Sequence, residues 1–313
     1  MKKINKKILD MIYSNKSFNE IMELCNLDNK SLSHKINILK RKGYLINNKI
    51  IDDGNIIYFL KRDIYREYSN TINLKVTDSN RFKCAVISDT HFGSGLDNMN
   101  YLDEVYNHCI NNDLHIIIHA GDLIDGNVGY FEREIPNIYD QVDYTIKNYP
   151  YCDNILNLVC LGNHDYTSIE ENLDIRKSLK NARSDLIPFG FGVGILNILN
   201  DQIIVKHKIN SLSFDDTPCN ITLLGHYHKM KSIMRDDDLV FMLPSLSDMQ
   251  FNDELPGFLT LDLSFENGKI IFSSADYFVI KNKVYKVASF ENDFIPNDRY
   301  VDEIDIVKEK RLL

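Results

Sequence analysis

Several things that the 313-residue sequence lacks narrow the class of protein. No stretch approaches the roughly 18 unbroken apolar residues that a membrane-spanning helix needs, and polar residues interrupt the basic N-terminus too soon for a signal peptide. The six cysteines form no Cys-x-x-Cys pair, and several lie in apolar runs as buried free thiols do. Internal repeats and low-complexity segments are absent. We therefore predict a globular protein of the reducing cytoplasm that makes no membrane contact.

Charge is distributed unevenly along the chain. Residues 1–66 carry 14 Lys and Arg against 7 Asp and Glu, a balance of +7. Because the whole chain has a net charge of −9, residues 67–313 carry −16. A basic head on an acidic body indicates two modules with different partners.

The head has the pattern of three helices followed by a hairpin. Apolar residues recur at helical spacing over 4–14, 18–25 and about 30–42. Two β-prone runs, 44–51 and 55–60, then flank an Asp-Asp-Gly-Asn turn signal. The body that follows alternates short apolar runs with helical patterns and becomes mostly β beyond residue 238, which indicates a layered α/β fold.

The order of elements in the head resembles the winged helix-turn-helix family, with 30–42 as the recognition helix and 44–60 as the wing. That resemblance implies that DNA is a partner and that four side chains face its major groove: Ser33, His34, Asn37 and Lys40. The alternative is that these residues form a solvated helix face and that the head binds protein. We place the head at 1–66, a linker at 67–81, the body at 82–288 and a C-terminal tail at 289–313.

Four short polar motifs in the body each follow an apolar, strand-like run, and a single histidine stands between the last two. They are Asp89-Thr90-His91, Gly121-Asp122-Leu123-Ile124-Asp125, Gly162-Asn163-His164-Asp165, His207 and Gly225-His226-Tyr227-His228. Ligands that emerge at strand ends are held by a rigid sheet, so one site can be assembled from residues far apart in sequence.

The side chains in these motifs suit divalent metal ions. Carboxylate, amide and imidazole together favour borderline ions such as Mn²⁺, Fe²⁺, Zn²⁺ or Ni²⁺, and the absence of cysteine from the motifs argues against structural zinc. The candidate ligands are two Asp, one Asn and four His, which is too many for one ion. They fit two ions that share a bridging carboxylate, spaced at the ~3.5–4 Å typical of two-metal phosphoryl chemistry.

With all five blocks in the expected order, the body resembles the calcineurin-like metallophosphoesterase superfamily. The resemblance implies a metal-dependent hydrolase whose fold is a four-layer α-β-β-α sandwich. It also implies two divalent ions, with Mn²⁺ favoured and Fe²⁺, Zn²⁺ or Ni²⁺ as alternatives. The implied ligands are Asp89, His91 and His228 for the first ion, Asn163, His207 and His226 for the second, and Asp122 as the bridge between them.

The same resemblance assigns the chemistry. A hydroxide shared by the metals attacks phosphorus in line, and its pKa is lowered by the cations. His164 stabilises the transition state or protonates the leaving oxygen, with Asp125 or Asp165 orienting its ring. The remaining four histidines, among them His119, receive no metal role.

Differences between these motifs and those of phosphoprotein phosphatases indicate which class of phosphoester is the substrate. Phosphoprotein phosphatases of the superfamily carry Gly after the first His, Arg-Gly after the second Asp of the Gly-Asp motif and Glu after Asn-His. This chain has Phe92, Gly126-Asn127 and Asp165 there. It looks more like the subgroup of SbcD-type exonucleases and small phosphodiesterases.

Within that subgroup we favour a DNA nuclease or DNA-end-processing enzyme, because phosphate contacts from a basic head suit nucleic acid. The alternative is a small-molecule phosphodiesterase or phosphomonoesterase whose head is regulatory or binds protein, which the acidic body favours. A non-catalytic winged-helix protein with a degenerate body is disfavoured because every ligand position is filled. The oligomeric state stays open, with a homodimer among the alternatives.

Overall fold

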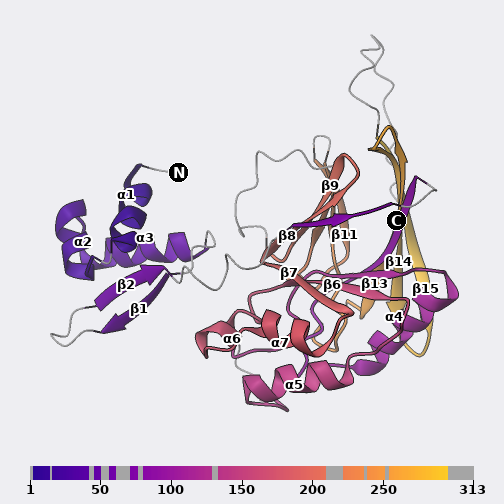
Figure 1. The fold of residues 1–313 in the computed structure, drawn as a ribbon, viewed down its shortest axis with the longest axis horizontal. Helices are drawn as coiled ribbons and strands as arrows, with labels where there is room; N and C mark the ends of the chain where they lie inside the picture. The colour runs from indigo at the N-terminus through magenta and orange to yellow at the C-terminus, as the bar shows by residue number, and fades with distance from the viewer. Residues whose placement is uncertain are drawn as a thin grey trace, which may run out of the picture.

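Figure 1 shows the protein as a computed structural model. The structure describes residues 3–14, 16–41, 46–50, 56–60, 71–76, 80–128, 133–208, 221–235, 238–250 and 254–294. Most of the predicted tail, from residue 295 onward, lies outside this set.

The N-terminal unit has the predicted order of three helices and a hairpin. Its elements are α1 (Lys3–Tyr13), α2 (Phe18–Cys25), α3 (Asn29–Arg41), β1 (Ile46–Ile50) and β2 (Ile56–Leu60), and the two strands pair antiparallel. The helices and the hairpin bury a core of their own, which includes Ile8, Ile21, Leu32, Leu39 and Ile46. The winged-helix assignment of this unit stays a prediction.

A seven-stranded mixed sheet forms one half of the body. Its order is β15-β14-β13-β4-β5-β6-β7. The parallel part comprises β4 (Arg81–Ile87), β5 (Ile116–His119), β6 (Leu156–Leu161) and β7 (Leu186–Phe191), and the antiparallel part β13 (Gly257–Glu266), β14 (Lys269–Ile280) and β15 (Val284–Asp293).

A six-stranded mixed sheet forms the other half, in the order β11-β12-β10-β9-β8-β3. Its strands are β3 (Thr71–Leu74), β8 (Val193–Ile198), β9 (Asp201–Lys206), β10 (Ile221–Leu224), β11 (Lys231–Arg235) and β12 (Asp238–Met242). β3 falls inside the range predicted as a linker, and it pairs in parallel with β8. The sheet thus begins before the predicted body does, and β15 likewise runs five residues past the predicted end at 288.

The two sheets pack face to face, and helices cover the seven-stranded one. Along β4, Cys84 and Val86 enter the core between the sheets, whereas Ala85 and Ile87 enter a second core with the helices, as the two-residue period of a strand requires. Helices α4 (Met99–Asn111), α5 (Ile138–Asn148) and α7 (Ile175–Ala182) contribute to that second core and lie along one face of the body (Figure 1). The short α6 (Thr167–Glu170) follows β6.

The α/β prediction with two packed sheets is confirmed. The described residues supply three of the four expected layers: helices, seven-stranded sheet and six-stranded sheet. A helical layer on the outer face of the six-stranded sheet has no counterpart among them. None of the helices in the described ranges is long and apolar enough to cross a membrane.

The topology brings the motif-bearing strand ends together. β4, β5 and β6 are parallel neighbours in one sheet, and β9 and β10 are parallel neighbours in the other. The carboxyl ends of parallel strands point to the same edge of a sheet, where ligands of open α/β folds bind. All five predicted blocks directly follow one of these strands.

Candidate metal centre

The predicted carboxylate and imidazole ligands converge into clusters that can hold metal ions. Asp89, His91 and His228 form one group, and Asp122, His207 and His226 form another, each with donor atoms within 4.8 Å of one another. A third group joins His91 and Asp122 with His164. The first two groups match the two halves that the sequence resemblance implies.

The backbone around the ligands adopts conformations that non-glycine residues rarely take. Five of the ligands have positive φ: Asp89, His91, Asp122, His226 and His228. Such residues cost free energy and cluster at functional sites, where the surrounding fold holds them in place.

Glycines before the ligands allow close approach. A Cβ at Gly162 would lie 2.2 Å from Asp122 Oδ1, and a Cβ at Gly121 would lie 2.2 Å from His207 Nδ1. Gly121 also has a φ of +106°. These two glycines therefore let the turns after β5 and β6 pack directly against ligand side chains.

Two buried, negatively charged carboxylates favour the binding of cations at the centre. Asp89 and Asp122 are 0% and 1% exposed. Burial works against the ionisation of both carboxylates. The pKa of Asp89 is nevertheless below its usual range because His228 and His207 lie beside it, and the pKa of Asp122 is lowered in the same way by His207. Against the same burial, Asp122 and Asp89 raise the pKa of His207 to about 9. Buried carboxylates whose ion pairs among the described residues are all with imidazoles are suited to divalent ions.

The imidazoles are oriented as metal ligands are. His228 Nδ1 donates to Met249 O at 2.6 Å, and His207 Nδ1 donates to Ala120 O at 2.8 Å. With Nδ1 protonated and held, Nε2 of each ring is left to ligate. His228 Nε2 lies 3.2 Å from His91 Nε2 and 3.4 Å from Asp89 Oδ1.

Two buried donor atoms of the predicted ligands make no hydrogen bond to any residue that the structure describes and so are available to a metal ion. Among the described residues, His207 Nε2 and Asn163 Oδ1 are buried without a hydrogen-bond partner. His207 Nε2 nevertheless lies 2.8 Å from Asp122 Oδ2, although not in hydrogen-bond geometry. Burial, with the charge of His207 next, lowers the pKa of His226 to about 4, which keeps this imidazole neutral. The residues present therefore fit divalent ions, because His207 Nε2 and Asn163 Oδ1 make no hydrogen bond within the described part of the chain and His226 is a neutral donor.

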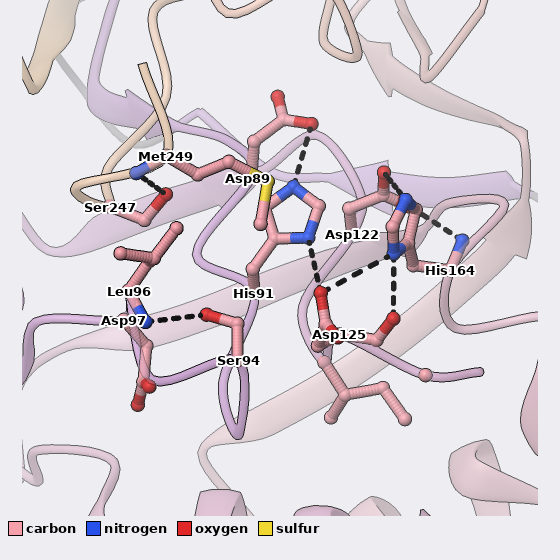
Figure 2. Close-up of polar contacts among 12 residues, drawn as sticks. Asp89, His91, Ser94, Leu96, Asp97, Asp122, Asp125, His164, Ser247 and Met249 are labelled. Atoms are coloured by element: carbon pink, nitrogen blue, oxygen red, sulfur yellow. Dashed lines mark hydrogen bonds and ion pairs between the residues drawn. The ribbon is translucent and has the colours of Figure 1, made fainter. Parts of the chain in front are cut away.

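His164 lies at the edge of both groups. Its Nδ1 donates to the backbone carbonyl of Asp125 at 2.6 Å, and its Nε2 lies 3.9 Å from Asp122 Oδ2. Figure 2 shows Asp125 between the rings of His91 and His164. His164 is thus placed to act on a group bound next to Asp122.

The structure separates the two carboxylates predicted to orient His164. Asp125 holds the ring through its backbone oxygen. Asp165 instead accepts hydrogen bonds from the backbone N–H groups of Leu123, Ile124 and Gly162, at 2.7–3.1 Å. Burial, followed by the charge of Asp122, raises the pKa of Asp165 to about 7. Asp165 braces the turns that carry Asp122 and Asn163 rather than contacting the His164 ring.

Supporting residues that the motifs did not reveal surround the centre. Ser245 Oγ donates to Asp89 O at 2.8 Å, Gln141 Oε1 accepts from Gly126 N at 2.7 Å, and Arg133 Nε donates to Asp125 Oδ2 at 2.8 Å. Ser245 follows a strand-like apolar run, as the recognised motifs do, and this signal could have identified it. Gln141 and Arg133 carry no such signal in the sequence.

The residues predicted to bind nucleic acid are on α3 of the N-terminal unit. His34 and Asn37 are exposed, and Ser33 is half-buried. Lys40 is part of α3, but its side chain lies outside the described set. Of the histidines given no metal role, His119 is buried and contacts Thr90 Oγ1 at 3.0 Å, and burial lowers its pKa to about 3.

Comparison with known families decides the assignment. The family model of the calcineurin-like phosphoesterases matches residues 82–272. The chain belongs to this family. It is a metal-dependent hydrolase of a family that uses two metal ions, and the matched residues contain every predicted ligand.

Solved structures similar to this chain include two phosphoesterases and a vacuolar protein sorting protein. An archaeal phosphodiesterase is 14% identical, with a TM-score of 0.42, over 64% of this chain and 100% of that one. YfcE, a phosphoesterase from E. coli, is 14% identical, with a TM-score of 0.39, over 61% and 98%. Vacuolar protein sorting 29 from Cryptosporidium parvum is 14% identical, with a TM-score of 0.44, over 68% and 98%. A search of curated protein sequences returns no significant match.

Proposed function

We propose that this phosphoesterase hydrolyses phosphodiester bonds with two divalent ions, for which Mn²⁺ is the favoured metal. The observation that carries the proposal is the division of the donors into two groups. Asp122 belongs to one and lies within the cluster that joins His91 and His164. When bound, the ions neutralise charge on the phosphate and make a water molecule more acidic.

The side chains around the ions have separate roles in this proposal. Asp122 lies between the groups and serves both, while Asp89 belongs to the first. His164 faces the substrate with Nε2 because its Nδ1 is held by the carbonyl of Asp125. His164 can give a proton from Nε2 to the leaving oxygen of the ester as the imidazolium, because Nδ1 keeps its own proton in the bond to Asp125 O.

For the substrate we propose DNA, cleaved by an SbcD-type nuclease or end-processing activity. The basic balance of residues 1–66 supports this, since phosphate contacts dominate nucleic-acid affinity. The exposed His34 and Asn37 on α3 also support it, as does the order of helices and hairpin that resembles a winged helix-turn-helix. In this proposal Ser33 and Lys40 complete the DNA-facing set.

A small phosphodiester or monoester is the second candidate. The observation that favours it is the charge of −16 on residues 67–313, which repels a long polyanion. In that case the N-terminal unit is regulatory or binds protein.

A substrate panel tests the proposal. The full-length protein with Mn²⁺ is offered linear duplex DNA, single-stranded DNA, bis-p-nitrophenyl phosphate and p-nitrophenyl phosphate, each beside an Asp122→Asn variant. We expect cleavage of DNA and of the diester, lost in the variant. Cleavage of bis-p-nitrophenyl phosphate with DNA left intact contradicts the nuclease proposal. Failure of every substrate in the wild type contradicts the hydrolytic proposal as a whole.

A further inference from the structure

Arg133 contacts the metal centre indirectly, by an ion pair with the carboxylate of Asp125. Its Nε donates to Asp125 Oδ2 at 2.8 Å, and the two side chains are 18% and 7% exposed. A largely desolvated ion pair of this kind holds both partners in a fixed geometry. Arg133 therefore determines how the Asp125 carboxylate is turned.

The other oxygen of that carboxylate faces two imidazoles. Asp125 Oδ1 lies 3.6 Å from His91 Nδ1 and 3.7 Å from His164 Nδ1 (Figure 2). His164 Nδ1 already donates to the backbone carbonyl of Asp125. His91 Nδ1, by contrast, is buried and has no hydrogen-bond partner within the described part of the chain. The carboxylate is thus the acceptor available to His91.

His91 differs in this respect from two other imidazole ligands. His207 and His228 each donate Nδ1–H to a backbone carbonyl, which is fixed by the fold. A metal-ligating histidine needs such a partner because the partner fixes the tautomer and the ring orientation. For His91 the partner is a side chain, whose orientation must itself be fixed.

We propose that Arg133 is a positioning residue for the ion held by Asp89, His91 and His228. It binds Asp125 Oδ2, so that Oδ1 stays turned toward His91 Nδ1, and its charge offsets that of the buried carboxylate. The inference rests on the proposed two-metal function. It adds a residue that controls the affinity of one ion without touching it.

Titration with Mn²⁺ tests this role in the full-length protein. Isothermal titration calorimetry on wild type, Arg133→Gln and Arg133→Lys measures each Mn²⁺ affinity. We expect Arg133→Gln to weaken one of two sites by about 10- to 100-fold, the range found when the partner of a ligating histidine is removed. The other site should be unchanged, and Arg133→Lys should recover part of the loss.

A double-mutant cycle shows whether Arg133 acts through Asp125. If it does, Asp125→Asn with Arg133→Gln binds Mn²⁺ no more weakly than Asp125→Asn alone, because the two losses are not additive. Additive losses overturn the proposal. So does an unchanged Mn²⁺ affinity in Arg133→Gln with a raised KM for bis-p-nitrophenyl phosphate, which would assign Arg133 to the substrate phosphate.

Arg183→Gln is the matched control. Arg183 forms an ion pair with Asp185, and the two side chains are 15% and 6% exposed. Its loss should lower the melting temperature and leave both Mn²⁺ affinities unchanged. Equal weakening of Mn²⁺ binding in Arg183→Gln would make the effect a general loss of stability and would overturn the proposal. A wild type that binds no Mn²⁺ contradicts the proposed function, whereas normal binding in Arg133→Gln contradicts only this inference.

Discussion

At the scale of single residues, three buried aspartates of the centre differ in pKa and in role because their surroundings differ. Asp89 and Asp122 face imidazoles, which hold their pKa values low and leave them as anions for cations to bind. Asp165 faces backbone N–H groups and the charge of Asp122, and burial raises its pKa to about 7. The motif Gly-Asn-His-Asp therefore contains a candidate metal ligand, a candidate proton donor and a structural brace in three consecutive residues.

The close contact at Gly162 gives a prediction at this scale. In Gly162→Ala the new Cβ would lie 2.2 Å from Asp122 Oδ1 and 2.5 Å from Asp122 N, so the ligand or its backbone must move. Overpacking of this kind costs about 1–3 kcal/mol. We expect lower unfolding free energy in urea denaturation together with at least a tenfold loss of Mn²⁺ affinity, on the order of 1.4 kcal/mol.

Gly268→Ala provides the control for that variant. Its Cβ would lie 2.4 Å from Asn200 Nδ2, at a turn between β13 and β14. We expect a loss of stability with Mn²⁺ affinity intact. Normal Mn²⁺ binding in Gly162→Ala would contradict the role assigned to the turn after β6.

At the scale of elements, the sequence pattern indicates which strand ends meet more clearly than it indicates the edge strands of the sheets. Each motif follows an apolar strand, and parallel neighbours carry their ends to one edge, so His91, Asp122 and Asn163 could be assigned together. β3 was assigned to a linker because it has four residues, too few to show a strand period against polar flanks. Its pairing with β8, in which Asn73 lies opposite Asn197 at 124 positions along the chain, is set by the tertiary fold.

Long-range contacts explain the other omissions in the site. Ser245 bonds to Asp89 across 156 positions, and Gln141 bonds to Gly126 across 15. The apolar run before Ser245 marks it as a candidate, but neither its contact with Asp89 nor that of Gln141 with Gly126 follows from composition or periodicity, because each contact exists only once the chain has folded. The same holds for the separate roles of Asp125 and Asp165, which differ only in what folds around them.

The capping box of α2 gives a prediction at the scale of elements. Ser17 Oγ accepts from Glu20 N at 3.3 Å, and the Glu20 carboxylate accepts from Ser17 N at 2.7 Å. Ser17→Ala removes the cap, which typically costs about 1 kcal/mol. Hydrogen exchange should show faster opening of amides in α1–α3, with amides of β4–β6 unchanged. Equal acceleration in both groups would contradict a separate core for the N-terminal unit.

At the scale of the whole molecule, the proposal joins a basic N-terminal unit to an acidic hydrolytic body. The N-terminal unit has its own buried cluster, and the two sheets of the body bury another between them. The DNA proposal requires these parts to act on one substrate. That requirement distinguishes it from the small-ester proposal, in which catalysis does not depend on α3.

Introducing negative charge on α3 tests this dependence. In the combined variant His34→Glu and Asn37→Glu, both at exposed positions, the new carboxylates repel phosphate. The two added negative charges offset about two positive charges of the N-terminal unit, which lowers the salt slope of DNA binding by about 2. We expect weaker DNA binding and slower DNA cleavage, with unchanged turnover of bis-p-nitrophenyl phosphate. Leu24→Glu, at a position on α2 that is 52% exposed, is the control and should leave DNA binding unchanged.

The central claim is that the two groups of ligands hold two ions that share Asp122. Its most direct test is anomalous diffraction from crystals of the Mn²⁺-loaded protein. The account predicts two Mn²⁺ peaks per chain, about 3.5–4 Å apart as in other two-metal sites. One peak should lie beside Asp89, His91 and His228, and the other beside Asn163, His207 and His226. A single peak, or peaks remote from Asp122, would contradict the account.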